Sequence, residues 1–499
     1  MPISQSDQLF QLVKSLTKAE KRNFTFYSSR IQDSDSLKYI QLFELIEKQK
    51  GLNDAQIIAK LKGVDKNQYS NLKRHLYKQL MVSLRMIHIQ KKTDIQIREY
   101  LDYVDILYGK GLYLQALKIL NKAKDLCEKS NNDLLFLSTL ETEKNIESRH
   151  ITRSGPDIVV ELIAKSEEKI KIANNIAKLS NIRLLLHSHY VKNGHVKNKA
   201  ELDHFVNEYC WVIASENQEG LSYYENIYLY QSLVWYYYII LDFENCLINA
   251  EHWVKLFQES PELIQEDPDL YMRGYHYILT CAYNLRLKDK YDQYLDELEA
   301  FRDKSYGQFN NNSQIISFLY VHYGRLNKYF LHEKYQEGLT IIPRTLRRIQ
   351  RYKTKLDAHR ILVFYFKIAW MHLMAGDHSM AIKYLNNIFQ MEVGSLREDI
   401  QGYSQLMFLM AHYDAGNDDI MDYLIKGVRQ FFNKMQEKNK LQVATIKFFS
   451  KIVKLPDSER KLLMKKYAEE LSIMEQDIFE KRSMLYLNIK SWLDKKMGT

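Results

Sequence analysis

Histidine is the residue type whose spacing in this chain comes nearest to that of a metal site. His187, His189 and His195 occur together in "LLHSHYVKNGH", and neutral imidazole nitrogens are common ligands of zinc and copper. On a helix, residues two positions apart point to different faces, so His187 and His189 would bind one ion together only from a loop. The sequence therefore favours ordinary surface or core histidines over a metal site.

The sequence lacks the motifs that hold nucleotide phosphates or a catalytic metal. It contains no Gly-x-x-x-x-Gly-Lys-Ser/Thr loop, no Gly-x-Gly-x-x-Gly and no His-Glu-x-x-His. Two Ser-x-x-Lys stretches, "SLTK" and "SNLK", stand without the companion motifs of the serine enzymes that use this pattern. We therefore expect no enzyme activity, no cofactor and no small-molecule substrate.

Tyrosine is the residue type that points to binding. Many of the 36 tyrosines crowd into "LSYYENIYLYQSLVWYYYII" at 221–240. A tyrosine ring offers a large contact area and a hydroxyl group that hydrogen-bonds, so tyrosine is frequent where proteins hold peptides. Residues seven apart share a helix face, which predicts a partner-binding groove made by Tyr223, Asn226, Tyr230, Gln231 and Tyr237. Packing between neighbouring helices is the competing interpretation.

Two stripes of basic residues are candidates for contact with nucleic-acid phosphates or with an acidic partner. The first lies on the outer face of a helix expected over 67–87 and contains Lys73, Arg74, Lys78 and Arg85. The second is Arg344, Arg348, Arg351 and Lys355, spaced by four, three and four residues. A solvated helix face is the competing interpretation of the first stripe, and the second could instead pair with the acidic segment 199–304 of the same chain.

The elements that position these residues are best read from "LVFYFKIAWMHLMAGDHSMAIKYLNNI" at 362–388. Its apolar residues follow the helical period on both sides of "AGDH". Gly376 suits the left-handed conformation that ends a helix, and Asp377 suits the cap of the next one. The stretch predicts two helices joined by a tight turn, with His378 as an exposed turn residue.

Other segments repeat this turn. "GLYLQALKILNKA" matches it through Gly111, Tyr113 and Ala116, and weaker copies are "LDFENCLINAEHW", "DKYDQYLDELEAF", "EKYQEGLTIIPRT" and "GNDDIMDYLIKGV". The pattern resembles the tetratricopeptide repeat, and the chain is similar to bacterial tetratricopeptide-like proteins. The resemblance implies a right-handed superhelical solenoid of helical hairpins over 95–430 that binds a partner on its concave face. The later copies of the turn lie farther apart along the chain than the about 34 residues of a regular tetratricopeptide repeat.

The two ends of the chain differ from this middle part. Residues 1–94 predict a basic helical domain in which a helix capped by Asn53 or Asp54, a turn at Gly63 and a helix from Asn67 resemble a helix-turn-helix. Residues 431–499 predict basic capping helices. Apolar residues there recur at near-heptad spacing, which would also suit pairing with another chain; they are Leu463, Tyr467, Leu471, Met474, Ile478, Leu485, Ile489 and Trp492.

The composition of the chain indicates its fold class. The 499 residues are 46% hydrophobic and include only 6 prolines, which favours an all-α protein. Four scattered cysteines, no signal-like start and no apolar run long enough for a membrane span predict a cytoplasmic protein without membrane insertion. We expect a non-enzymatic scaffold or adaptor whose groove around 221–301, with tyrosines and acidic side chains, binds a basic protein or peptide segment. The alternative is a nucleic-acid- or ribosome-associated regulatory factor that uses the basic N-terminal helix.

Overall fold

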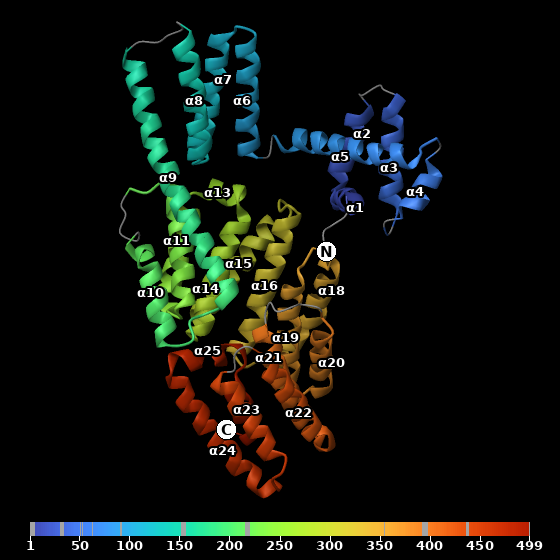
Figure 1. The fold of residues 1–499 in the computed structure, drawn as a ribbon, viewed down its shortest axis with the longest axis vertical. Coiled ribbons are helices and arrows are strands. Elements are labelled where there is room, and N and C mark those ends of the chain that lie inside the picture. The colour runs from blue at the N-terminus through green and yellow to red at the C-terminus, as the bar shows by residue number, and fades with distance from the viewer. Residues whose placement is uncertain are drawn as a thin grey trace. The chain divides into compact units, whose positions relative to one another are not determined.

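The structure is a computed structural model that describes residues 5–29, 34–49, 51, 53–61, 63–89, 92–150, 156–214, 220–353, 355–391, 398–435 and 439–498. Within these ranges every regular element is a helix, which confirms the predicted all-α class. The chain divides into two compact units, Met1–Asn175 and Ile176–Thr499. Helix α9 (Pro156–Asn193), the long green helix of Figure 1, contributes to both.

Unit 1 contains two groups of helices, and each group has its own core. The first group is α1 (Gln5–Ser15), α2 (Lys18–Ser29), α3 (Ser34–Lys48), α4 (Asp54–Lys60) and α5 (Lys66–His88). Phe24, Leu42 and Leu76 are buried among them. The second group is α6 (Thr93–Gly109), α7 (Tyr113–Lys129), α8 (Asp133–Arg149) and the start of α9, with Leu120 and Leu140 among its buried residues.

Side-chain caps start the N-terminal helices largely where the sequence predicts them. Thr17 and Glu20 form the predicted capping box at the start of α2, with each side chain bound to the other residue's backbone N–H. Asn53 caps α4. Helix α5, however, begins at Lys66 and not at Asn67, because Asp65 is its cap and completes a capping box with the third residue of the helix.

Unit 2 consists of the remaining helices, which pack in chain order around one continuous core. They are α10 (Lys199–Ala214), α11 (Tyr223–Ile239), α12 (Phe243–Glu259), α13 (Pro261–Glu266), α14 (Pro268–Asn284), α15 (Lys288–Ser305), α16 (Asn311–Leu331), α17 (Tyr335–Gly338), the 3₁₀ turn η1 (Leu339–Ile341), α18 (Ile342–Tyr352), α19 (Ala358–Ala375), α20 (His378–Phe389), α21 (Glu398–Asp414), α22 (Asp418–Lys434), α23 (Lys440–Ile452), α24 (Asp457–Gln476), α25 (Ile478–Tyr486) and α26 (Ile489–Met497). Consecutive helices such as α11 and α12, or α19 and α20, pack against each other across short turns.

The turns between paired helices share one hydrogen-bond geometry. In each turn a residue with positive φ follows the first helix, and the next N–H donates to the carbonyl oxygen five residues earlier, as in the Schellman motif. The donor and acceptor residues, 2.8–3.1 Å apart, are Leu112 and Leu107, Asn132 and Cys127, Asp242 and Tyr237, Leu287 and Ala282, Lys334 and Tyr329, Asp377 and His372, and Asn417 and His412. The turn predicted at Gly376 is confirmed, and it recurs where the chain has no glycine.

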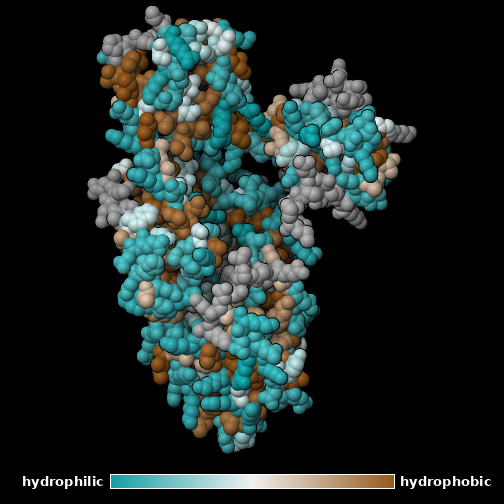
Figure 2. Space-filling view, viewed as in Figure 1, coloured by the Kyte–Doolittle hydropathy of each residue, from teal (hydrophilic) through white to brown (hydrophobic). Residues whose placement is uncertain are grey.

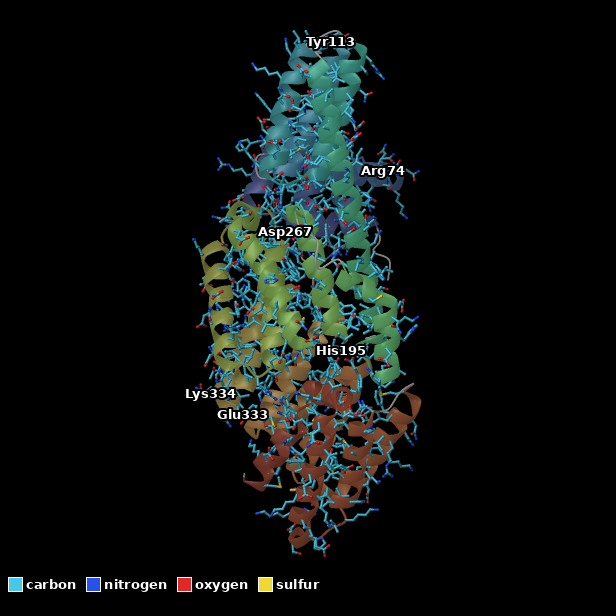
Figure 3. The ribbon with its side chains drawn as sticks, turned by 90° about the vertical axis from the view of Figure 1, so that its left-hand side faces the viewer. Arg74, Tyr113, His195, Asp267, Glu333 and Lys334 are labelled. Atoms are coloured by element: carbon cyan, nitrogen blue, oxygen red, sulfur yellow. The ribbon has the colours of Figure 1, made fainter. Side chains whose placement is uncertain are left out.

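Where a turn has a non-glycine residue at positive φ, replacing that residue by glycine should stabilise the protein. Glu333, labelled in Figure 3, is exposed and has φ 58°, whereas Gly376 has φ 86°. A side chain in the left-handed region costs about 1 kcal/mol, so we expect Glu333→Gly to stabilise unit 2 by roughly that amount. Gly376→Ala is the matched control, since an added Cβ would touch nothing there, and it should destabilise the unit equally. Urea-unfolding midpoints followed by circular dichroism should move in opposite directions.

The C-terminal segment packs within its own unit. Its near-heptad residues fall on three separate helices, α24, α25 and α26, which form the red end of the chain in Figure 1. Tyr467, Leu471 and Trp492 belong to the core of unit 2, so this apolar pattern is used inside the chain. The Trp492 indole N–H also donates to the Asp414 carboxylate at 2.8 Å, which ties α26 to α21.

His378 does not lie on an exposed turn, contrary to the prediction. It is the first residue of α20, its side chain is 26% exposed, and its Nδ1 atom lies 4.0 Å from the Asp414 carboxylate. Asp377 caps the helix as predicted, so His378 is already helical, and its imidazole is half-buried near the Asp414 carboxylate of the next helix.

Hydrophilic residues cover most of the face shown in Figure 2. Hydrophobic residues also reach the surface of unit 1, over the α6–α9 end in this view, where Leu114, Leu134 and Val160 are more than half exposed. Among the described helices, none is both long and apolar enough to cross a membrane.

Candidate functional site

The residues predicted to form a groove on α11 lie in different environments. Gln231 and Tyr237 are buried in the core of unit 2. Tyr223 and Tyr230 are half-buried, and their rings pack against rings of α12. The Asn226 amide donates to two backbone carbonyl groups at the start of its own helix. This side of α11 packs against its partner helix, as the competing interpretation expects.

A different side of α11 carries an open network of rings. Trp235 and Tyr238 lie 5.7 and 6.3 Å from Tyr277 of α14, measured between ring centroids, and Tyr190 of α9 contacts both. His276, next to Tyr277, stacks on a ring of α16 with centroids 4.5 Å apart. All but Tyr277 are half-buried. We call this set the ring face, and its members are Tyr190, Trp235, Tyr238, His276, Tyr277 and Tyr320.

Positive charges surround the middle of the ring face. Arg273 lies one turn before His276 on α14, and Arg360 and Lys367 lie on α19. Burial lowers the pKa of His276 to about 4, with further lowering from Arg273, Lys367 and Arg360. The imidazole is therefore neutral at pH 7 and lies in a positive field.

Two carboxylates of the acidic segment form ion pairs with cations of neighbouring helices. Glu251 of α12 forms an ion pair with Lys290 at 2.7 Å, and Glu299 of α15 binds Arg325 at 2.5 Å. That tyrosines and acidic side chains share one binding face stays a prediction, since Glu251 also accepts a hydrogen bond from Tyr294 at 2.8 Å and Glu297 accepts one from Tyr275 at 3.0 Å. Glu251 and Glu299 lie on the second helices of their pairs, and the cations Arg273 and Lys367 lie near His276 of the ring face.

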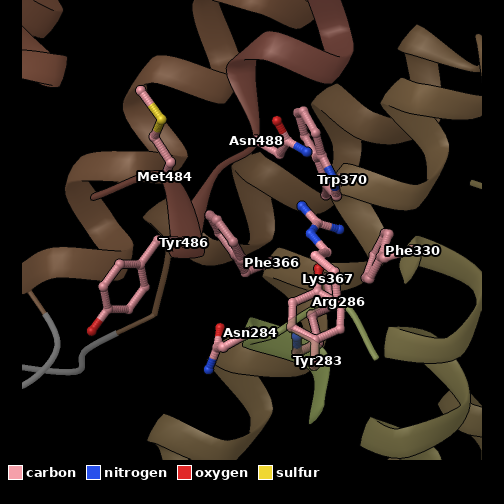
Figure 4. A pocket seen from close by; sticks show the side chains of 10 residues that line it. All are labelled: Tyr283, Asn284, Arg286, Phe330, Phe366, Lys367, Trp370, Met484, Tyr486 and Asn488. Carbon is pink, nitrogen blue, oxygen red and sulfur yellow. The ribbon is translucent and has the colours of Figure 1, made fainter. Parts of the chain in front are cut away.

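A small cavity adjoins the ring face at the C-terminal end of α14 (Figure 4). Its volume is about 70 Å³, and its described lining residues include two cations, Arg286 and Lys367, and no Asp or Glu. The Arg286 guanidinium lies over Tyr283, and the Lys367 ammonium lies over Phe330 and donates to a side-chain oxygen of α16. The lining residues are Tyr283, Asn284, Arg286, Phe330, Phe366, Lys367, Trp370, Met484, Tyr486 and Asn488.

The cavity adjoins a cleft of about 700 Å³, because Asn284, Arg286, Met484 and Asn488 line both. The cleft is bordered by the turns at 284–286 and 333–335 and by α24–α26. It contains charges of both signs, among them an ion pair between α24 and α26 at 2.9 Å. The C-terminal helices therefore form one wall of both hollows.

The second basic stripe lies on α18 and just beyond it. Arg344, Arg351 and Lys355 are exposed, and the half-buried Arg348 donates to the Tyr306 hydroxyl at 3.2 Å. Within the described ranges none of these four cations forms an ion pair. The acidic segment therefore leaves this stripe without a carboxylate partner there.

The basic residues of α5 fall into three environments. Lys73 pairs with an aspartate of α4 at 3.1 Å, and the exposed Arg85 pairs with an aspartate of α6 at 2.6 Å. Arg74, labelled in Figure 3, and Lys78 are exposed and line a hollow of about 560 Å³. Its other described lining residues contain one more cation and no Asp or Glu; they are Lys38, Val64, Gln68, Asn71, Leu72 and His75.

The three histidines considered for a metal lie against different neighbours. His187 contacts Trp235 edge-on, His189 contacts Phe205, and the Nδ1 atom of His195 lies 2.8 Å from a backbone carbonyl oxygen of α11. In the part of the chain that the structure describes, no three His, Cys, Asp or Glu side chains are grouped to hold a metal.

Comparisons of the chain with family models, with curated proteins and with solved structures found no match. Function is therefore argued from the site itself, which combines the ring face, its neighbouring cations and the cavity that adjoins the cleft.

Proposed function

We propose that this chain is a non-enzymatic helical-repeat scaffold that binds a protein or peptide partner through the ring face and the cleft. The observation that carries the proposal is the ring face itself, a continuous aromatic surface bordered by cations and next to a cleft. Such surfaces hold extended segments by large ring contacts and a few charged anchors. The recurring Schellman turns support a right-handed solenoid of tetratricopeptide-like hairpins.

The orientation of the rings favours a protein partner over single-stranded nucleic acid. A nucleobase binds by stacking on an open ring face. Here His276 and Tyr320 stack on each other, and Trp235 has edge-to-face contacts with His187 and Tyr277. The faces of these rings are largely used within the protein, which disfavours the stacking of nucleobases on them.

Affinity purification from the native cells, with and without nuclease, tests the proposal when wild type and Arg273→Glu are compared by mass spectrometry. Arg273 is half-buried beside the ring face, hydrogen-bonds Tyr320 and forms no ion pair within the described ranges, so its reversal should remove the partner, and an unchanged circular dichroism spectrum assigns the loss to binding. Lys383→Glu, on the exposed side of α20, is the matched control and should retain it. A nuclease-resistant partner that Arg273→Glu captures as well as wild type would place binding elsewhere.

A second candidate function is nucleic-acid or ribosome association by unit 1, favoured by the hollow that Arg74 and Lys78 line. Phosphate binding by these cations should weaken steeply with salt. In fluorescence anisotropy with a labelled RNA, the double variant Arg74→Glu and Lys78→Glu should lose binding, whereas Lys60→Glu on α4 should keep most of it. Equal RNA affinity in the two proteins would exclude this surface.

A further inference from the structure

We infer that the cavity beside α14 holds one anionic group, a carboxylate or a phosphate, carried by a partner segment that lies in the adjoining cleft. This inference rests on the proposed function, since it names the chemistry of the same partner. The inferred partner segment carries a negative charge, whereas the acidic composition of residues 199–304 predicted a basic partner segment.

The charges of the cavity are the first argument. Arg286 and Lys367 come from different parts of the chain and line one small hollow whose described walls contain no Asp or Glu. Two cations at a shared, partly dehydrated site repel each other, and an anion between them removes that repulsion. The rings under both cations attract them only weakly by comparison.

The hydrogen-bonding groups are the second argument. The planar Arg286 guanidinium presents a fork of N–H donors that matches carboxylate and phosphate oxygens, and it forms no ion pair within the described ranges. Asn284 and Asn488 add side-chain amides from opposite walls. Together these groups offer donors around a space that has no negative charge of its own.

The size of the cavity is the third argument. A space of about 70 Å³ holds a few water molecules or the head of one carboxylate or phosphate group, but no aromatic ring. The chain that carries the anionic group would occupy the cleft of about 700 Å³ outside. The cavity is therefore an anchor point, and the cleft and the ring face hold the rest of the segment.

The C-terminal segment completes this site. Met484, Tyr486 and Asn488 form one wall of the cavity, and Tyr486 stacks on Tyr403 of α21 with ring centroids 5.1 Å apart. Helix α26 follows directly, and Trp492 anchors it to Asp414. In this arrangement the C-terminal helices do more than close the end of the helical stack.

Calorimetric titration of the full chain tests the inference with inorganic phosphate, an acetyl-capped pentaglutamate amide and its pentaglutamine counterpart. We expect saturable binding of phosphate, of pentaglutamate or of both, and none of pentaglutamine. Each of Arg286→Gln and Lys367→Gln should weaken binding by about tenfold or more, as expected for one lost charge-assisted contact. Lys383→Gln is the matched control, and Lys367→Arg should retain most of the affinity.

The two anion probes distinguish the sources, since phosphate alone would indicate a phosphorylated segment and pentaglutamate alone an acidic one. A nuclear magnetic resonance titration of labelled histidine adds a second readout, in which a bound anion should raise the low pKa of His276. Absence of saturable binding to either probe, or unchanged affinity in both glutamine variants, would overturn the inference.

Failure of this inference is distinguishable from failure of the proposed function. If Arg286→Gln and Lys367→Gln both capture the partner as wild type does, the inference of an anion site is rejected and the proposed scaffold function is retained. If phosphate or pentaglutamate binds in the cavity while Arg273→Glu still captures the partner fully, the anion site stands and the ring face is not the binding surface.

Discussion

Replacing Trp492 by alanine should lower the free energy of unfolding of unit 2 by about 3–5 kcal/mol. The Trp492 side chain is 1% exposed, and its indole N–H donates to the Asp414 carboxylate, which is itself only 3% exposed. The substitution leaves a large cavity and removes one of the groups that contact a buried charge, which Lys496 also contacts at 2.7 Å. Because α26 follows the cavity wall, anion binding should weaken as well.

Hydrogen exchange measured by mass spectrometry locates this effect, since exchange should rise first in peptides from α26 and α21. Trp492→Phe retains most of the packing but loses the hydrogen bond to a charged group, so it should cost about 1.5–3 kcal/mol. Trp211→Ala, at a side chain 44% exposed, is the matched control and should change the stability by less than about 0.5 kcal/mol. Unchanged exchange in α26 of Trp492→Ala would contradict the packing described here.

Trp253→Ala should have an effect of similar size, about 3–5 kcal/mol, in the helices beneath the ring face. Trp253 of α12 is 1% exposed and lies 5.9 Å from Tyr277 between ring centroids. It also packs under Gly274 of α14, where an added Cβ would lie 3.7 Å from the indole. Loss of this side chain removes the support of Tyr277, so near-ultraviolet circular dichroism of the tyrosines should change together with the urea midpoint.

Trp253→Phe separates packing from hydrogen bonding at the same position. Within the described residues the indole N–H of Trp253 has no hydrogen-bond partner, so phenylalanine loses no bond and fills most of the volume. The cost should stay below about 1.5 kcal/mol. A phenylalanine variant as unstable as the alanine variant would show that the indole N–H has a partner after all.

Features that depend on neighbours within about four residues could be predicted from the sequence. The all-α class follows from the scarcity of helix breakers, and the caps at Thr17 and Asn53 follow from side chains that bind their own backbone. The turn at Gly376 follows from the ease with which glycine adopts positive φ. Equivalent turns at Arg286 and Glu333 carry no such signal, because helix packing holds them in a conformation that their own side chains disfavour.

For the candidate site, the sequence predicted the types of residue involved but not which of them lie together in the fold. Helical spacing separates Tyr230 from Trp235 on α11, but it does not say which of the two faces packs on α12 and which meets α14. Composition likewise shows an acidic segment without showing that Glu299 forms an ion pair with Arg325.

The sequence by itself determined the helices, their caps and the glycine turns of this protein, because those depend on short-range sterics and hydrogen bonds. The tertiary structure alone decided which tyrosines are buried, which cations pair with Glu251 and Glu299, and that Arg286, Lys367 and Asn488 line one cavity. These three residues are brought together by packing between helices far apart in the chain, and no local pattern in the sequence encodes that contact.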